Sequence, residues 1–292
     1  MPELAYTRTG SGEPMVLLHG LGSWRHAWDP VIPALAERFD VIAVDLPGFG
    51  DSPPIVPSRG TFAAGPARKG PEVSPAALAA AVAGLLDDLG LTRPHLAGNS
   101  LGGWVALELA KIREPASVTL LSPAGLWRGR IPLYDRISLQ GSRWMCRHFD
   151  GMLYLLVGNP LGRAIVLGQT HGRPIRMSPG LARATIRAMA TGEGFEAVMR
   201  STIASPYRAG PPIAAPVTVA FGSRDLLLRR RSRHLDQLPD DVRTGSLPRS
   251  GHVPMADNPA AVVDLILQGA TVRKSTERLV IPSTADRRPS RV

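Results

Sequence analysis

Short apolar runs recur along the chain, and glycine-rich turns follow many of them. Strands that are buried on both faces of a parallel sheet have this pattern, because helices cover both faces. Polar residues such as glycine, serine and aspartate gather where the runs end. We therefore expect strands at residues 15–18, 41–44, 95–97, 117–121, 217–221 and 242–247.

Helical patterns lie between these runs. The clearest spans residues 75–89, where apolar residues recur at helical spacing, Ser74 can cap the first turn and Gly90 can end the last. A second helix is predicted at 258–267, again with proline at its start. Strands that alternate with helices predict a doubly wound, mostly parallel α/β sheet, whose ligands bind beyond the carboxyl ends of the strands.

A long region without strands interrupts the alternation. Residues 123–210 contain helical pieces, for example 180–190 and 194–201, and lie between two predicted strands. We interpret this region as a helical cap that is inserted into one α/β core. The core is then formed by residues 1–122 and 211–270.

Two further stretches do not fit the alternation. Residues 51–73 are rich in proline, glycine and serine, and a loop of this length is usually functional or disordered. Residues 271–292 are polar and rich in arginine. We predict that this second stretch is a disordered tail.

The bulk composition is typical of a globular enzyme. The chain has 292 residues, of which 44% are hydrophobic and 20% charged, so it can bury a substantial core. Cys146 is the only cysteine, which excludes an intrachain disulfide and a cysteine metal cluster. No apolar run is long enough to span a membrane, and the N-terminus does not resemble a signal peptide. We expect a cytoplasmic protein that uses no metal and no cofactor.

The formal net charge of +10 comes almost entirely from arginine, because lysine occurs only at Lys69, Lys111 and Lys274. No recognisable nucleic-acid-binding motif accompanies the charge, so nucleic acid is not an expected partner. The predicted cap holds twelve arginines against four acidic residues. This excess has two interpretations: a compositional bias on solvated helix faces, or a lid that attracts an anionic substrate.

The stretch 94–103 combines a short buried strand, a Gly-x-Ser-x-Gly turn and the start of a helix expected at 104–111. Such a turn exposes the hydroxyl of its serine, here Ser100. Glycine is needed at Gly98 and Gly102, because strand and helix cross closely there. The pattern alone is weak, since an ordinary glycine-rich corner can have the same sequence. Ser100 is therefore a candidate nucleophile whose support must come from elsewhere in the chain.

A serine hydroxyl is a poor nucleophile near neutral pH and needs a base, which in turn needs a carboxylate to orient it. Asp225 stands in a turn after one predicted strand, and His252 stands beyond the next. His19-Gly20 follows an earlier strand, where a backbone N–H can face the serine. The chain thus offers one candidate for each role, in the order serine, aspartate, histidine.

With the turn at 45–52, these motifs make the chain resemble the α/β-hydrolase family over residues 4–122 and 211–268. The resemblance implies a hydrolase whose site is built from residues of several strand ends. The roles that it implies are Ser100 as nucleophile, His252 as base, Asp225 as orienting acid, and the backbone N–H groups of Leu21 and Leu101 as oxyanion hole.

Two other polar residues have structural interpretations. The family uses the backbone beside His19 and not its side chain, and Asp45 is expected to tie down the glycine-rich turn that follows it. In some relatives the orienting acid follows the strand that here ends at Leu121. Residues 122–124 read Ser-Pro-Ala and include no carboxylate, which favours Asp225.

Serine at the nucleophile position implies acyl transfer through an acyl-enzyme, because members that resemble haloalkane dehalogenases or epoxide hydrolases carry aspartate there. We expect hydrolysis of a carboxylic ester. The expected substrate is a small hydrophobic molecule. Because the predicted cap is basic, an anionic substrate stays an alternative. The natural substrate and the oligomeric state cannot be read from the sequence.

Other functions stay open. Residues 98–100 and 121–126 resemble C–C bond hydrolases that act on vinylogous diketone ring-cleavage products, although His19-Gly20 and Val253 depart from that branch. Cofactor-free haloperoxidase or perhydrolase activity is a further option. A non-catalytic receptor or scaffold on the same fold is disfavoured, because such proteins typically lose one of the three catalytic residues.

Overall fold

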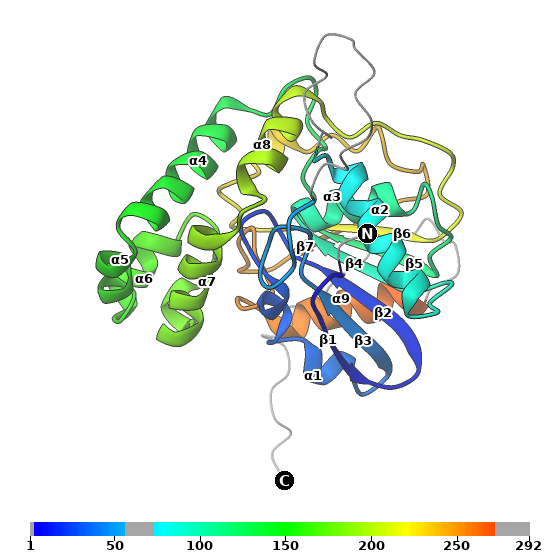
Figure 1. Ribbon diagram of the computed structural model, residues 1–292, viewed down its shortest axis with the longest axis horizontal. Coiled ribbons are helices and arrows are strands. Elements are labelled where there is room, and N and C mark those ends of the chain that lie inside the picture. The colour runs from blue at the N-terminus through cyan, green and yellow to red at the C-terminus, as the bar shows by residue number, and fades with distance from the viewer. Residues whose placement is uncertain (1–2, 56–72, 272–292) are drawn as a thin grey trace.

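A computed structural model of the chain describes residues 3–55 and 73–271. Its centre is a seven-stranded sheet in the order β1-β3-β2-β4-β5-β6-β7 (Figure 1). All strands run parallel except β1, which pairs with β3 in antiparallel register at one edge. The strands are β1 (Tyr6–Gly10), β2 (Glu13–Leu18), β3 (Phe39–Val44), β4 (His95–Asn99), β5 (Ser117–Leu121), β6 (Val217–Gly222) and β7 (Arg243–Leu247).

The predicted strands are confirmed as β2 to β7, with small differences at their ends. The edge strand β1 was not predicted, because its sequence is polar and its side chains are mostly exposed. One of them, Arg8, donates to the carboxylate of Asp40 on β3 at 2.9 Å. An edge strand needs only one neighbour and no apolar run, so the pattern of buried strands could not reveal it.

Helices cover both faces of the sheet. On one face lie α2 (Pro75–Asp88) and α3 (Leu101–Leu109), and on the other lie α1 (Ile32–Leu35) and α9 (Pro259–Thr271) (Figure 1). The Ser74 hydroxyl accepts from the N–H of Ala77 at 3.2 Å, as predicted for the start of α2. The helix expected from residue 104 begins three residues earlier, because its first turn contains the glycines of the serine turn.

Between β5 and β6 the described chain forms helices and loops but no strand, and we call its helical part, residues 133–204, the helical insertion. They lie to one side of the sheet, on the left in Figure 1. Two of them match the predicted pieces at 180–190 and 194–201; the boundaries proposed at 123 and 210 stay predictions. The helices are α4 (Leu133–His148), α5 (Asp150–Leu156), α6 (Pro160–Leu167), α7 (Pro179–Thr191) and α8 (Phe195–Ala204).

Two arginines of the helical insertion are buried and make hydrogen bonds within it. The guanidinium of Arg143 is buried and donates to Glu196 at 3.1 Å and to the carbonyl oxygen of Gly192 at 2.9 Å. Arg163 is also buried and donates to the carbonyl oxygen of Val157 at 2.9 Å. These two arginines close helix ends and loops, so they do not contribute to an external basic surface.

Residues 56–72 of the loop predicted at 51–73, and residues 272–292 of the tail predicted at 271–292, lie outside the described residues. Both therefore stay predictions. Within 3–55 and 73–271, none of the helices combines the length and the apolar character that crossing a membrane requires.

Candidate active site

Ser100 occupies the turn between β4 and α3. Its backbone has a φ of 53° and a ψ of −114°, a conformation that is costly for a residue with a side chain. A side chain at Gly98 would overlap the carbonyl oxygen of Gly102, and one at Gly102 would overlap that of Leu18. The expectation that both positions require glycine is confirmed. The strained turn puts Ser100 on the wall of a cavity.

Asp225 and His252 come together beyond the carboxyl ends of β6 and β7. His252 Nδ1 and Asp225 Oδ2 lie 3.0 Å apart, and both residues are buried. His252 lines the same cavity as Ser100. Among the described residues, Ser100 and His252 are not joined by a hydrogen bond. In enzymes without bound substrate, the distance between nucleophile and base is often too long for one.

The ionised state of Asp225 determines which ring nitrogen of His252 carries the proton. Burial disfavours the charged carboxylate, but the charge and hydrogen bond of His252 and the N–H of Leu228 outweigh it, so the pKa of Asp225 lies below its usual value. The second carboxylate oxygen accepts from the N–H groups of Leu227 and Leu228 at 3.0 and 2.9 Å. Because an ionised carboxylate only accepts, the neutral form of His252 carries its proton on Nδ1, which leaves Nε2 free to accept a proton.

The loop after β2 packs directly against the serine turn. A Cβ atom at Gly20 would lie 3.2 Å from that of Ser100. The side chain of His19 is buried, and its Nε2 accepts from the N–H of Leu46 at 3.0 Å. His19 Nδ1 must then carry the proton, and it donates to the carbonyl oxygen of Gly20 at 2.8 Å. Burial also lowers the pKa of His19, which keeps the ring neutral.

That bond and the hydrogen bond from the N–H of Ser23, at 3.2 Å to the same oxygen, hold one peptide group at the site. The carbonyl of Gly20 and the N–H of Leu21 belong to the same planar peptide unit, so holding the oxygen sets the direction of the N–H. Leu21 and Leu101 both line the cavity with Ser100. The N–H of Leu101 stands at the first position of α3, where no carbonyl of the helix can accept from it.

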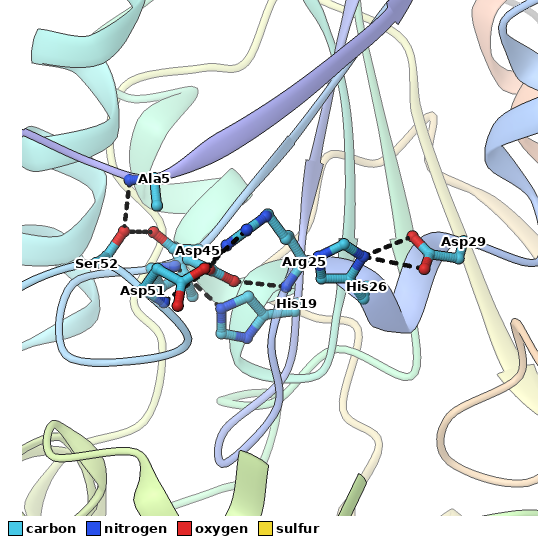
Figure 2. A network of polar contacts seen from close by, with 9 residues as sticks. Ala5, His19, Arg25, His26, Asp29, Asp45, Asp51 and Ser52 are labelled. Carbon is cyan, nitrogen blue, oxygen red and sulfur yellow. Dashed lines mark hydrogen bonds and ion pairs between the residues drawn. The ribbon is translucent and has the colours of Figure 1, made fainter. Parts of the chain in front are cut away.

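Asp45, at the end of β3, anchors two loops at once (Figure 2). Its carboxylate accepts from the backbone N–H of Arg25 at 2.6 Å and from that of Asp51 at 3.0 Å. The Arg25 guanidinium pairs with both carboxylates, at 2.7 Å to Asp51. The predicted role of Asp45 in its own turn is confirmed, and it extends to the segment that follows Leu21.

Asn99, next to Ser100, makes contacts in the site that the sequence pattern did not predict. Its buried side-chain amide donates to the carbonyl oxygen of Leu121 at 3.0 Å and to that of His252 at 2.9 Å. The residue beside the candidate nucleophile therefore holds the backbone of the candidate base. The motif around Ser100 contained Asn99, but the direction of its side chain depends on strands far away in the sequence.

Asp257 is a second missed residue. Its carboxylate accepts from the N–H of Gly251 at 2.7 Å, and from the N–H groups of Gly172 and Arg173 at 2.6 and 2.8 Å. It thus joins the helical insertion to the loop of His252. In the sequence, an acid just before a helix indicates a favourable N-terminal charge and nothing more.

The cavity in front of Ser100 is mostly apolar. Its walls include Trp127 beyond β5 and Met189 and Val198 from the helical insertion. Among the described residues that line it, none is arginine or lysine, so the charged excess of the insertion supplies no cation there. A carboxyl group does reach it: Asp135 of α4 is 2% exposed, and burial raises its pKa to about 6. The sequence had marked Asp135 only as one of the few acids of the predicted cap.

Comparisons with known proteins agree with this architecture. The chain is 31% identical over 217 residues to the epoxide hydrolase EphH of Mycobacterium tuberculosis, covering 66% of this chain and 94% of the relative. It is 29% identical over 272 residues to the pimeloyl-[acyl-carrier protein] methyl ester esterase of Aeromonas hydrophila, covering 89% and 96%. The crystal structure of the enol-lactonase from Burkholderia xenovorans LB400 aligns with a TM-score of 0.69 at 24% identity, over 93% and 97% of the two chains.

The two relatives are hydrolases named for different activities, so they agree on the class of reaction and not on a substrate. The sequence model of the alpha/beta hydrolase family matches residues 15–265, which include most of β2, the strands from β3 to β7 and every candidate residue of the site. The protein is a hydrolase, and its chain belongs to the alpha/beta hydrolase family.

Proposed function

We propose that the protein is a serine hydrolase that cleaves a carboxylic ester through an acyl-enzyme. The observation that carries the proposal is the buried Asp225–His252 bond beside a cavity on which a strained serine stands. In this proposal Ser100 is the nucleophile, His252 the base and Asp225 the acid that orients it. The substrate is a small and largely hydrophobic molecule, since the cavity wall is mostly apolar.

The reaction then has two half-steps. Ser100 Oγ attacks the ester carbonyl while His252 Nε2 takes its proton, and the same proton passes to the leaving alcohol as the C–O bond breaks. His252 next removes a proton from water, which attacks the acyl-enzyme, and then gives that proton to Ser100 Oγ as the acyl–Oγ bond breaks and the acid leaves. The N–H groups of Leu21 and Leu101 stabilise the negative charge on the carbonyl oxygen in both steps.

His19 is a positioning residue in this proposal. Replacing it by alanine removes the shorter of the two hydrogen bonds that hold the Gly20 carbonyl, and the N–H of Ser23 keeps the other, so we expect kcat to fall about tenfold to a hundredfold while KM changes little. The variant also leaves the N–H of Leu46 unpaired, which should cost about 1–3 kcal/mol of stability. Steady-state kinetics and thermal unfolding separate the effects: lower stability with an unchanged kcat would limit His19 to a structural role.

Two related activities need separate treatment. The relative named an epoxide hydrolase does not bring that activity to this chain, because epoxide-opening members of the family use an aspartate nucleophile where Ser100 stands here. C–C bond hydrolysis is the second candidate, because it could use the same three residues and because 98–100 and 121–126 resemble that branch.

The test combines a covalent probe with a substrate panel. A fluorophosphonate should label the native protein at Ser100, detected by peptide mass spectrometry, and p-nitrophenyl esters should show a burst of one p-nitrophenol per active site. Ser23 lines the same cavity, and Ser23→Ala is the matched control that should keep both signals. If a yellow vinylogous dienolate is bleached enzymatically while esters are barely hydrolysed, C–C hydrolysis replaces the proposal. Absence of labelling at Ser100 contradicts both activities.

A further inference from the structure

Asp135 is the most unusual polar residue of the cavity. It belongs to the first turn of α4 and is 2% exposed. Its Oδ2 atom is buried without a hydrogen-bond partner among the described residues. The side chain nevertheless lines the cavity that contains Ser100 and His252. A buried carboxyl group that faces a binding cavity without a partner calls for a physical explanation.

Keeping this carboxyl unpaired is costly. Burial of a charge without compensation disfavours the folded state, and burial also raises the pKa of Asp135 to about 6. The charged groups that face it do not remove the cost: His252, Arg229 and Arg231 favour its ionised form, whereas Asp225 opposes it. A hydrophobic residue would be more stable at this position in the absence of a ligand. The cost therefore points to a bond that forms only when a ligand is present.

We propose that Asp135 is a specificity residue, whose carboxyl group accepts a hydrogen bond from a hydroxyl or ammonium group of the substrate. The inference rests on the proposed function, because it places that donor on an ester whose carbonyl lies at Ser100. The rest of the wall is apolar or neutral, so a single donor bound at Asp135 would fix the orientation of an otherwise hydrophobic substrate.

This assignment reverses the charge that the composition suggested for the substrate. The arginines of the helical insertion would favour an anion, but none of the described residues on the cavity wall is cationic. A carboxylate on the substrate would instead face the carboxyl group of Asp135. The selectivity of the site follows from the groups at its wall and not from the net charge of the chain.

The experiment compares isosteric esters on the native protein. One set varies the acyl side and consists of p-nitrophenyl heptanoate, p-nitrophenyl 6-hydroxyhexanoate and p-nitrophenyl 6-aminohexanoate. A second set places the same groups on the alcohol side of butyrate esters. We expect kcat/KM to be at least tenfold higher for a donor-bearing ester than for its hydrocarbon isostere, in one of the two sets. The hydroxyl and ammonium members distinguish a neutral donor from a cationic one.

Variants tie this preference to the carboxyl group. Asp135→Leu should abolish the preference and leave hydrolysis of the heptanoate within about threefold of the native value. Asp135→Asn keeps an acceptor, so it should retain a preference for the hydroxyl group and lose that for the ammonium group. Asp150→Asn removes an exposed acid of the same insertion and should change neither. Equal loss on all esters in the Leu variant, or no donor preference in the native protein, overturns the proposal.

Thermal unfolding gives a second readout. The pKa of about 6 in the folded protein lies above the ordinary aspartate value of 3.8, so the folded protein retains the proton longer and stability falls as pH rises between these values. Asp135→Leu should raise the Tm by about 2–4 °C at pH 8, and by less at pH 4. A lower Tm at both pH values would mean that the carboxyl group already has a structural partner.

Failure of the ester chemistry is distinguishable from failure of this inference. Methyl ketones with the same chains as the esters cannot be hydrolysed, and calorimetry measures their binding directly. Preferential binding of the hydroxy ketone by the native protein but not by Asp135→Leu supports the inference even if no ester is cleaved. If the native protein binds the hydroxy ketone and its hydrocarbon isostere equally, the inference about Asp135 is contradicted, whatever the reaction at Ser100.

Discussion

Replacing Ser100 by alanine is expected to lower kcat for the best ester substrate roughly ten thousandfold to a millionfold. In the proposed mechanism only the hydroxyl attacks the ester, so only the contributions of binding and of the oxyanion hole should survive. The measurement is the steady-state rate together with the loss of the p-nitrophenol burst. KM should change little, because the hydroxyl stabilises the transition state whereas the apolar walls of the cavity bind the substrate.

The controls for this variant are set by the turn itself. Alanine at position 100 keeps the positive φ and the close crossing of β4 and α3, so the Tm should stay within a few degrees of the native value. Ser23→Ala, on the same cavity, should keep the native rate. Full turnover by Ser100→Ala would mean that the nucleophile lies elsewhere.

Replacing Asp225 by asparagine is expected to lower kcat about ten thousandfold. The amide can keep the packing and could donate to His252, but it then stabilises the tautomer that carries the proton on Nε2, which cannot accept a proton from Ser100. Rates measured from pH 6 to pH 9 should show the deficit throughout, because the low pKa of Asp225 keeps the native carboxylate ionised across that range.

The matched control is Asp236→Asn, which replaces an exposed carboxylate that pairs with the Arg128 guanidinium at 3.7 Å. It should leave kcat within about twofold of the native value. If Asp225→Asn retains more than a tenth of the native rate, the carboxyl group of Asp135 becomes the candidate for orienting His252. A double variant that replaces both Asp225 and Asp135 would then lose the residual activity of the single Asp225 variant.

Much of the fold could be predicted because it depends on local patterns. Buried parallel strands give continuous apolar runs, and helix starts such as Ser74 carry their own capping residue, so both are visible in a few neighbouring letters. The meeting of Asp225 and His252 could also be predicted, because parallel strands end at one edge of the sheet and the family resemblance gave their order. The polar edge strand β1 has neither kind of pattern.

The residues that were missed share a different property. Asn99 and Asp257 make hydrogen bonds to partners far away in the sequence, and the direction of each side chain is set by the packing of other elements. Asp135 was visible only as an acid among arginines, because burial depends on how α4 lies over the cavity. Patterns of residue type determine which elements form, whereas side-chain partners depend on the assembled molecule.

The triple hydrogen bond of Asp257 has a consequence for protein engineering. A helical insertion taken from another hydrolase cannot simply be grafted between β5 and β6, because the loop of His252 is held by the same carboxylate as the backbone of Gly172 and Arg173. Gly172 and Gly251 also approach so closely that a side chain on either would contact the other's backbone. A functional chimaera must therefore keep residues 170–173 with the recipient core, so that the exchangeable unit is smaller than the insertion.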